Sequence, residues 1–526
     1  MFTRRRFAGL LTVLILASLL LGGWVGNRVH AARDTAYENL RLFNDVFNNV
    51  MAKYVEAVEP QKLIFGAIRG MLGTLDPHTQ FLDPDEYKDL MVGTHGSYGG
   101  LGIQISVRDE VLTVIAPIEG SPAYRAGILA GDQIVKINAK STKGITEQDA
   151  MKQLRGPKGT QVTLSIQREG LPEASDYTLT RDVINLESIS YAGIVKPGIG
   201  YVRLASFSEK AGEEVSQAID SLEHVGMKSL ILDLRGNPGG LLAQAVSVTE
   251  NFLDKGQRVV FTRGRLQDAN KDYFIERGTK YGKFPLVVLV DQGSASASEI
   301  VAGSVQDWDR GLILGKPSFG KGSVQTVVQL PEESALKLTT AKYYTPSGRC
   351  IHKDNGQGEE EDTTQAKAPD KSAAKKDLFY TLGGLKRTVY GGGGITPDIA
   401  VENQTLNKFS QGLARYFFGY AVKYASAHKG LGRNFTVTDE MVENFKKYLT
   451  EKKVTFTPED FKVNEDYIRF GVRFSLMTNL FGDKATYASG VRFEKDNQFQ
   501  KAVEVLAKAK TLGDLLAQAA KTAEKK

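Results

Sequence analysis

The alternation of hydrophobic and polar residues divides the chain into regions of different character. An apolar run extends from Phe7 to about Val25. Residues 32–92 repeat apolar positions at intervals of three and four, which predicts two amphipathic helices. In residues 93–171, short alternating segments such as LGIQISV and VTLSIQ flank one helical segment, TEQDAMKQL, and predict a small β-rich module. The change of pattern predicts several domains rather than one core.

From residue 172 onward, predicted strands and helices alternate. The strand GIGYVRLASF precedes the helix SEKAGEEVSQAIDSLEHVG, and then two buried strands, in SLILDLRGNPGG and FPLVVLVDQGSASAS, each lead through a turn into a helix. The first turn is rich in glycine and the second in serine. Backbone N–H groups are unpaired at a helix N-terminus, and the helix dipole favours negative charge there. We therefore expect both turns to face one site.

Two later segments differ from this α/β pattern. Residues 353–377 are charged and polar and almost lack large apolar side chains, so we expect a disordered loop. Beyond Asn403, periodic stretches such as LARYFFGYAVKYA and DEMVENFKKYL predict a helical extension. The sequence leaves open whether this extension mediates dimerisation or docks on the N-terminal helices.

The N-terminus has the composition of an export leader. Three arginines precede the apolar run of residues 7–25, and small residues follow it near position 31. The bulk of the chain is therefore expected outside the cytoplasm, in the periplasm. A run of roughly 19 apolar residues nearly spans a bilayer, which slightly favours an inner-membrane anchor over a cleaved signal peptide.

Composition narrows the classes of partner and cofactor. The chain has 526 residues, of which 41% are hydrophobic, as in ordinary globular proteins. Its net charge is +6, but residues 1–31 hold four arginines and no acid, so only +2 belongs to the rest. We therefore expect no nucleic-acid partner. Cys350 is the only cysteine, which excludes an intrachain disulfide and a cysteine-based zinc site.

The serine-rich turn offers a nucleophile, and a lysine offers a base. Ser294, Ser296 and Ser298 stand at a strand-to-helix corner, and a serine hydroxyl needs a neighbouring base to become nucleophilic. The six histidines do not lie in recognisable triad segments: His30, His78, His95, His224, His352 and His428. A lysine can replace histidine where burial lowers its pKa. Lys321, Ser323 and Gln325 follow at a spacing of two, which places them on one face of a strand.

The β-rich module resembles a PDZ domain, in the loop GGLGI and the segment SPAYRAGILAGDQIVKIN. This resemblance implies that protein or peptide substrates bind through their accessible C-termini. Glycine-rich backbone can turn N–H groups toward a carboxylate, while the next strand pairs with an extended peptide. The alternative is that the glycines only permit a tight turn. The implied peptide-binding residues are Gly99, Gly100, Leu101, Gly102 and Ile103.

The run GSASASEIVAG followed by PSFGKGSVQ resembles the signature of the C-terminal processing peptidases, or tail-specific proteases, of peptidase family S41. The resemblance implies that Ser296 is the nucleophile, that Lys321, 25 positions later, is the general base, and that Gln325 holds its amine. The residues alone do not distinguish Ser296 from the serines on either side.

The same resemblance implies an oxyanion hole and a regulatory residue. One donor is expected from the N–H of Ala297 and the other from Gly239 or Gly240 in the RGNPGG turn. Arg155, in LRGPKG, is expected to sense a bound tail. The resemblance implies no metal or organic cofactor, and it leaves open a homodimer and an activator or adaptor protein.

The implied fold is an α/β protease core of crotonase-like ββα repeats, with an inserted PDZ domain and helical terminal regions. The leading interpretation is a serine endopeptidase. The alternatives are a non-catalytic tail-binding scaffold and a crotonase-like acyl-transfer enzyme. The expected regions are a leader (1–31), a helical region (32–92), the PDZ domain (93–171), the protease core (172–403) and a helical extension (404–526).

Overall fold

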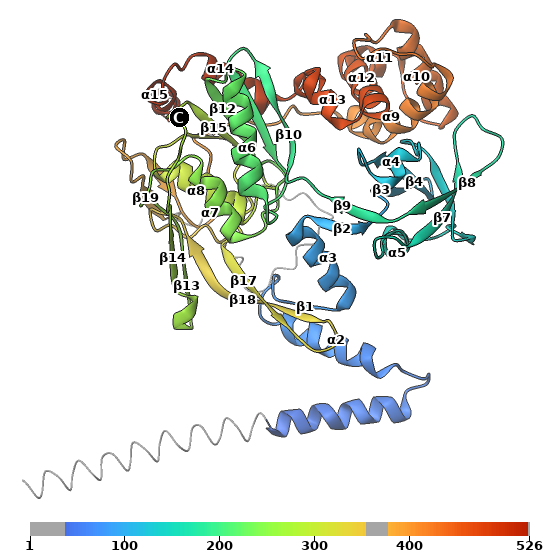
Figure 1. Ribbon diagram of the computed structural model, residues 1–526, viewed down its shortest axis with the longest axis horizontal. Helices are drawn as coiled ribbons and strands as arrows, with labels where there is room; N and C mark the ends of the chain where they lie inside the picture. The colour runs from blue at the N-terminus through green and yellow to red at the C-terminus, as the bar shows by residue number, and fades with distance from the viewer. Residues whose placement is uncertain (1–36, 354–376, 524–526) are drawn as a thin grey trace, which may run out of the picture. The chain divides into compact units, whose positions relative to one another are not determined.

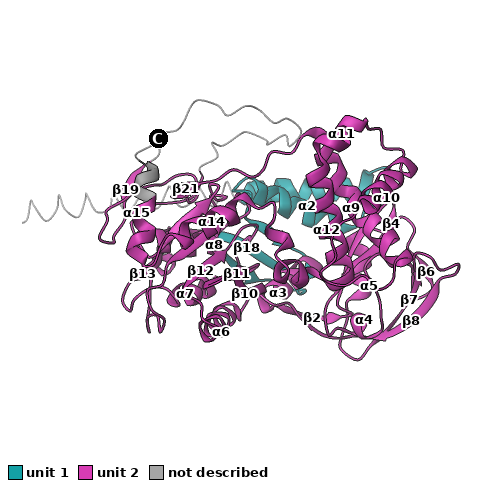
Figure 2. Ribbon diagram, turned by 90° about the horizontal axis from the view of Figure 1, so that it is seen from above, with its two compact units in different colours: residues 1–84, 326–339 teal, residues 85–325, 340–526 magenta. Residues whose placement is uncertain are grey.

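The computed structural model describes residues 37–353 and 377–523 (Figure 1). The predicted leader and nearly all of the predicted disordered loop lie outside these residues. Within the described ranges, no helix combines the length and the apolar character needed to cross a membrane. The chain divides into two compact units, residues 1–84 with 326–339 and residues 85–325 with 340–526 (Figure 2).

The first unit contains the two helices that the sequence predicts. One covers residues 37–53, and the other is α2 (Pro60–Gly73). The segment after them includes the short strand β1 (Gln80–Leu82), which pairs antiparallel with the first residues of β18 (Ala335–Tyr344). Phe65 of α2 packs on Phe81 of β1, with ring centroids 4.7 Å apart.

The PDZ-like module of the second unit has its own sheet and its own apolar core. Helix α3 (Pro84–His95) precedes it, and β2 (Ser97–Gly100) pairs antiparallel with β9 (Asp182–Asn185). The sheet has the order β3-β4-β5-β7-β8, with β6 paired to β5, so β3 is an edge strand. Its elements are β3 (Ile103–Arg108), β4 (Val111–Pro117), α4 (Pro122–Arg125), β5 (Gln133–Ile137), β6 (Lys140–Ser141), α5 (Glu147–Leu154), β7 (Gln161–Gln167) and β8 (Ser175–Thr180).

A second sheet forms the α/β core, in the order β10-β11-β12-β15-β16-β21. Strand β10 is antiparallel to β11, and the remaining neighbours are parallel. Both β12 and β15 are buried along their whole length, as parallel strands are when helices cover both faces. The strands are β10 (Ile189–Lys196), β11 (Ile199–Leu204), β12 (Ser229–Asp233), β15 (Leu286–Val290), β16 (Leu312–Gly315) and β21 (Ile399–Ala400).

One face of this sheet is covered by α6 (Ala211–His224), α7 (Leu242–Glu250) and α8 (Ala297–Asp307). The sequence predicts each of these helices. Every residue of α8 is buried, so this helix lies inside the core and not on its surface.

The other face is covered by helices from the C-terminal extension. The rings of Phe493 and Phe499 meet the ring of Tyr201 edge-on, at centroid distances of 5.1 and 5.8 Å. The last part of the extension therefore belongs to the core, which the sequence did not reveal. Its elements are α13 (Asp483–Ala488), η2 (Val491–Phe493), α14 (Asn497–Ala507) and α15 (Leu512–Ala523).

The earlier part of the extension forms a separate helical bundle. Phe417 and Phe445 stack at its centre, with ring centroids 5.0 Å apart. The bundle also contacts the PDZ-like module, where Lys452 forms an ion pair with Asp109 at 3.0 Å. Its helices are α9 (Lys408–Ala427), α10 (Asp439–Glu451), α11 (Pro458–Val463) and α12 (Glu465–Phe481).

Several smaller elements complete the second unit. Strand β13 (Arg258–Gly264) pairs with β14 (Lys271–Phe274) and with residues 341–344 of β18. The short helix η1 (Gln267–Ala269) lies between β13 and β14. Beyond the undescribed loop, β19 (Leu378–Tyr380) pairs with β20 (Thr388–Tyr390).

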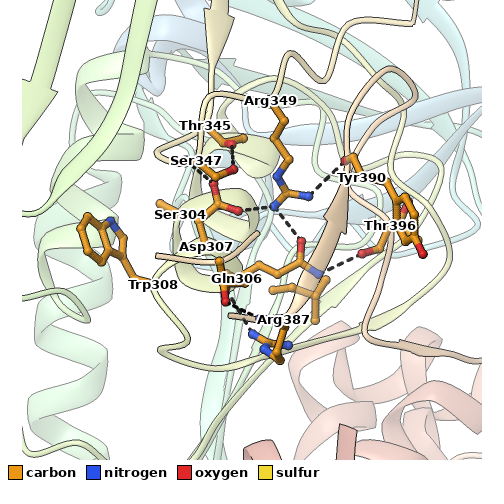
Figure 3. A network of polar contacts seen from close by, with 12 residues as sticks. Ser304, Gln306, Asp307, Trp308, Thr345, Ser347, Arg349, Arg387, Tyr390 and Thr396 are labelled. Carbon is orange, nitrogen blue, oxygen red and sulfur yellow. Dashed lines mark hydrogen bonds and ion pairs between the residues drawn. The ribbon is translucent and has the colours of Figure 1, made fainter. Parts of the chain in front are cut away.

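A buried polar network holds the C-terminal end of α8 (Figure 3). The guanidinium of Arg349 binds the Asp307 carboxylate at 2.7 Å and the side-chain oxygen of Gln306 at 2.8 Å, and it also donates to the carbonyl of Tyr390. Both members of the Arg349–Asp307 pair are fully buried. Loss of one partner of such a pair leaves an uncompensated charge, which typically costs about 3–5 kcal/mol. The network therefore fixes α8 against the segments on both sides of the undescribed loop.

We predict that Phe499→Ala weakens the α/β core, because it removes a buried ring from the second face of the sheet. Truncation of a core phenylalanine typically lowers the free energy of unfolding by about 3–5 kcal/mol. Native-state hydrogen exchange of the β15 amides should therefore become faster. Phe445→Ala is the matched control, because it empties the separate core of the bundle and should leave β15 exchange unchanged. If both variants accelerated the exchange of the β15 amides equally, the conclusion that the extension contributes to two separate cores would be wrong.

Candidate active site

The two turns that the sequence predicts to face one site do meet. Strands β12 and β15 are parallel neighbours, with Asp233 opposite Leu289. Parallel neighbouring strands end at the same sheet edge, so residues 234–241 and 291–297 leave the sheet side by side. The N–H of Ala295 donates to the carbonyl of Asn237 at 3.0 Å, which joins the turns directly.

The outer two serines of the run hold these turns together. Ser294 donates its hydroxyl to the carbonyl of Leu234 at 2.8 Å, and Ser298 donates to the carbonyl of Asn237 at 2.9 Å. Both serines are fully buried. Ser296 is partly exposed. The structure therefore supplies a distinction that the residues alone did not: of the three serines, only the middle one is accessible to solvent.

Ser296 has a strained backbone at the N-terminal end of α8. Its φ and ψ are 53° and −112°, a combination that non-glycine residues rarely adopt. Such conformations cost of order 1–3 kcal/mol and cluster at active sites, where the surrounding structure enforces them. The side chain is thereby held at the helix N-terminus, where the dipole favours a developing negative charge.

The glycine-rich turn approaches Ser296 closely. A Cβ added to Gly239, whose φ is 99°, would lie 2.9 Å from both the Cβ of Ser296 and the backbone nitrogen of Ala297. The N–H of Gly239 is already bound to the side-chain oxygen of Asn237 at 2.9 Å. Within the described part of the chain, no acceptor lies on the N–H of Gly240 or of Ala297. The two N–H groups available near Ser296 are therefore those of Gly240 and Ala297.

The segment that carries Lys321 passes beside the same corner. The N–H of Phe319 donates to the carbonyl of Ser294 at 3.0 Å. Lys321 is partly buried and lies just before β17 (Ser323–Gln329), and the amide of Gln325 donates to the hydroxyl of Ser323 at 2.8 Å. The structure thus brings the chain segments of Ser296 and Lys321 together and places Ser323 and Gln325 on one face of a strand.

Sequence reasoning misses one residue of this site, Glu299. Its carboxylate is fully buried in α8 and accepts the N–H of Ser296 at 2.8 Å and that of Lys321 at 3.0 Å. Burial raises the pKa of the Glu299 carboxyl, and hydrogen bonds from Ser318 and from backbone N–H groups oppose the shift. The available signal was the spacing Ser-x-x-Glu at a helix start, which indicates a capping box.

The PDZ-like loop has the properties expected of a carboxylate site. Gly102 has a φ of 71°, and a Cβ there would lie 2.3 Å from the Cβ of Ser121, so no larger residue fits. In the residues that the structure describes, the N–H groups of Leu101 and Gly102 have no acceptor. Ile103 begins the edge strand β3.

Gly99, Gly100 and Arg155 lie beside this loop. The two glycines belong to β2, opposite Val183 and Asp182 of β9. Arg155 forms an ion pair with Asp89 and lies over the Tyr98 ring, 5.0 Å from its centroid. The regulatory role of Arg155 stays a prediction.

Comparison with protein families agrees with the geometry. Residues 198–364 match the model of peptidase family S41, and residues 91–167 match that of the PDZ domain. A carboxy-terminal-processing protease of Bartonella bacilliformis is 46% identical over 60% of this chain and 73% of its own length. The chain belongs to the carboxy-terminal processing proteases of peptidase family S41. The predicted resemblance and the predicted fold class, an α/β S41 core with a PDZ domain and helical termini, are therefore confirmed.

Other S41 relatives match over a similar extent. The carboxy-terminal processing protease CtpA of Bacillus subtilis is 36% identical, over 66% of this chain and 74% of its own length. A carboxyl-terminal-processing protease of Synechocystis is 37% identical, over 66% of this chain and 86% of its own length. The terminal regions also match family models: residues 26–86 match the activating protease CtpB N-terminal domain, and residues 413–463 match a C-terminal helical domain of probable PDZ-proteases.

Proposed function

We propose that this S41 peptidase is a serine endopeptidase that captures the C-terminal tails of proteins through its PDZ domain and cleaves them with Ser296 and Lys321. One observation carries the proposal. Ser296 stands at a strained helix N-terminus between two open N–H groups and the segment of Lys321. That is the set of groups that acyl transfer requires: a nucleophile, a base and an oxyanion site.

In the proposed reaction, the Oγ of Ser296 attacks the scissile carbonyl carbon while the neutral amine of Lys321 takes the hydroxyl proton. Collapse of the tetrahedral intermediate breaks the C–N bond, and the protonated lysine gives its proton to the leaving amine. Water, deprotonated by the same lysine, then hydrolyses the acyl-enzyme. Gln325 holds the lysine amine in this scheme.

The oxyanion would be held by the N–H groups of Ala297 and Gly240. Of the two glycines that the sequence left open, Gly240 is favoured because the N–H of Gly239 is already bound to Asn237. Gly239 instead lets the turn approach Ser296 without a clash. Loss of one such donor typically lowers the rate by about 100-fold to 1,000-fold.

The tail would bind along the open edge of β3. The N–H of Val107 points away from β4, since it donates to the carboxylate of Glu147 on α5 at 2.9 Å. Because N–H groups alternate along a strand, those of Ile103 and Ile105 face the same open edge. A tail can pair with them while its carboxylate reaches the N–H groups of Leu101 and Gly102.

Location and assembly are further parts of the proposal. The apolar run of residues 7–25 supports an exported, periplasmic enzyme that is anchored in the inner membrane. The helix of residues 37–53 exposes several large apolar side chains, which supports a homodimer: Tyr37, Leu40, Leu42, Phe43 and Val46. Two forms of regulation belong to the same proposal: Arg155 senses a bound tail, and a separate activator or adaptor protein acts on the enzyme.

We predict that Ser296→Ala and Lys321→Ala each lower kcat by at least about a thousandfold. Tail binding should be unchanged, because capture takes place on the PDZ domain. The measurement is digestion of an unfolded protein with an apolar C-terminus, either free or capped as an amide. The wild type should cleave the free form faster than the amide, because only a free carboxylate can bind the PDZ loop.

Each other outcome identifies a different function. Full activity of Ser296→Ala would refute the assignment of Ser296 as the nucleophile. Tail binding by the wild type without any cleavage would favour a non-catalytic scaffold. Turnover of an acyl-CoA thioester in place of the protein would favour an acyl-transfer enzyme.

We also predict that Glu147→Ala tightens the binding of longer tails. The variant frees the N–H of Val107, and one added hydrogen bond contributes about 0.5–1.5 kcal/mol, or roughly twofold to twelvefold in affinity. Fluorescence anisotropy should show this gain for a peptide of five residues, which reaches Val107, and not for one of three. An equal gain for both lengths would contradict the pairing along β3.

A further inference from the structure

The Glu299 carboxylate binds groups from two separate segments of the chain. Oε2 accepts the N–H of Ser296 at 2.8 Å and the N–H of Lys321 at 3.0 Å. Oε1 accepts the N–H of Gly320 at 2.8 Å and the hydroxyl of Ser318 at 2.6 Å. A helix cap needs only the first of these bonds. The other three join α8 to the loop that carries Lys321.

The pattern of partners suits a carboxylate, which has two acceptor oxygens. All four partners are N–H or O–H groups, and a carboxylate offers about four acceptor positions and no proton. A glutamine in the same place would accept at one oxygen only, and its NH2 group would face two donors. Two acceptor oxygens at this position are therefore what allow both segments to be bound at once.

Tyr343 binds the same lysine at its carbonyl, and its hydroxyl also lies beside the side chains of Ser296 and Glu299. Its hydroxyl donates to the carbonyl of Lys321, and its side chain is buried in the core. Burial raises the pKa of Tyr343 well above its usual value, with a further contribution from the charge of Glu299, so the hydroxyl keeps its proton at neutral pH. Lys321 thus has its N–H bound by Glu299 and its carbonyl bound by Tyr343.

We propose that Glu299 is a positioning residue that sets the geometry between nucleophile and base, with Tyr343 as its partner on Lys321. A single oxygen, Oε2, binds the backbone of both Ser296 and Lys321. It holds Ser296 in its strained conformation and keeps the lysine segment beside it. The inference rests on the proposed Ser296–Lys321 chemistry and adds a residue that touches neither the substrate nor the reacting atoms.

The test is Glu299→Gln in the full chain, with cleavage of a tail-bearing protein as the first readout. A displacement of about 1 Å between reacting groups can cost about a hundredfold in rate. We expect kcat to fall by about that factor while KM changes less than twofold, because tail capture on the PDZ domain is intact.

The matched control is Asp398→Asn. Asp398 is another largely buried carboxylate that contacts α8, where it accepts from the Gln306 amide at 3.0 Å, and it also binds the N–H of Ile313 and Arg387. This variant measures the general effect of neutralising a buried carboxylate on the core. Its kcat, corrected for the folded fraction, should remain that of the wild type.

A second readout separates positioning from loss of folded protein. A fluorophosphonate probe labels the catalytic serine, and in the wild type its labelling rate should level off with pH once Lys321 is neutral. In Glu299→Gln the rate should instead rise in proportion to hydroxide, because the base no longer serves Ser296. A smaller folded fraction would lower the labelling rate at every pH without changing the shape of its pH profile.

Tyr343→Phe is the second variant, should Glu299→Gln fail to fold. It removes one hydroxyl, and we expect kcat to fall by about tenfold with KM unchanged. Wild-type kcat in either variant would overturn the inference, and so would a loss that only follows the folded fraction with an unchanged pH profile. Absence of both cleavage and labelling in the wild type would instead overturn the proposed function.

Discussion

The parallel pairing of β12 with β15 is the constraint on which the candidate site depends. It makes two segments that are about 60 residues apart in sequence leave the sheet at the same edge. The glycine turn and the serine corner then bind each other through Asn237, Ser294 and Ser298. With these bonds formed, Ser296 is the only one of the three serines that is accessible to solvent. Its strained backbone is held by the bonds of the neighbouring serines and of its own N–H to Glu299.

Much of this arrangement could be predicted because local pattern and tertiary structure agree. The strand–turn–helix repeats follow from hydrophobic periodicity, and the PDZ module follows from the resemblance of its loop and its central segment to a known family. The meeting of the two turns follows from the rule that parallel neighbouring strands end at one edge. Even the missed Glu299 had a local signal, three positions after Ser296.

Other features could not be predicted, because they depend on contacts between distant residues. No feature of the neighbouring sequence distinguishes Ser294 and Ser298, which bind Leu234 and Asn237, from the partly exposed Ser296. Choosing between Gly239 and Gly240 required knowing that the Asn237 side chain binds one of them. Likewise, helices α10 and α14 have similar amphipathic patterns, yet one belongs to a separate bundle and the other covers the central sheet.

The place of α14 has a consequence for how the chain folds. The second face of the central sheet, formed by residues 199–399, is buried by residues 487–516, and the whole bundle lies between them in sequence. During synthesis that face must remain uncovered until the ribosome has made the bundle and the helices after it. Contacts of such long sequence separation form slowly. The order of the chain therefore delays completion of the catalytic core until well after the PDZ domain can fold.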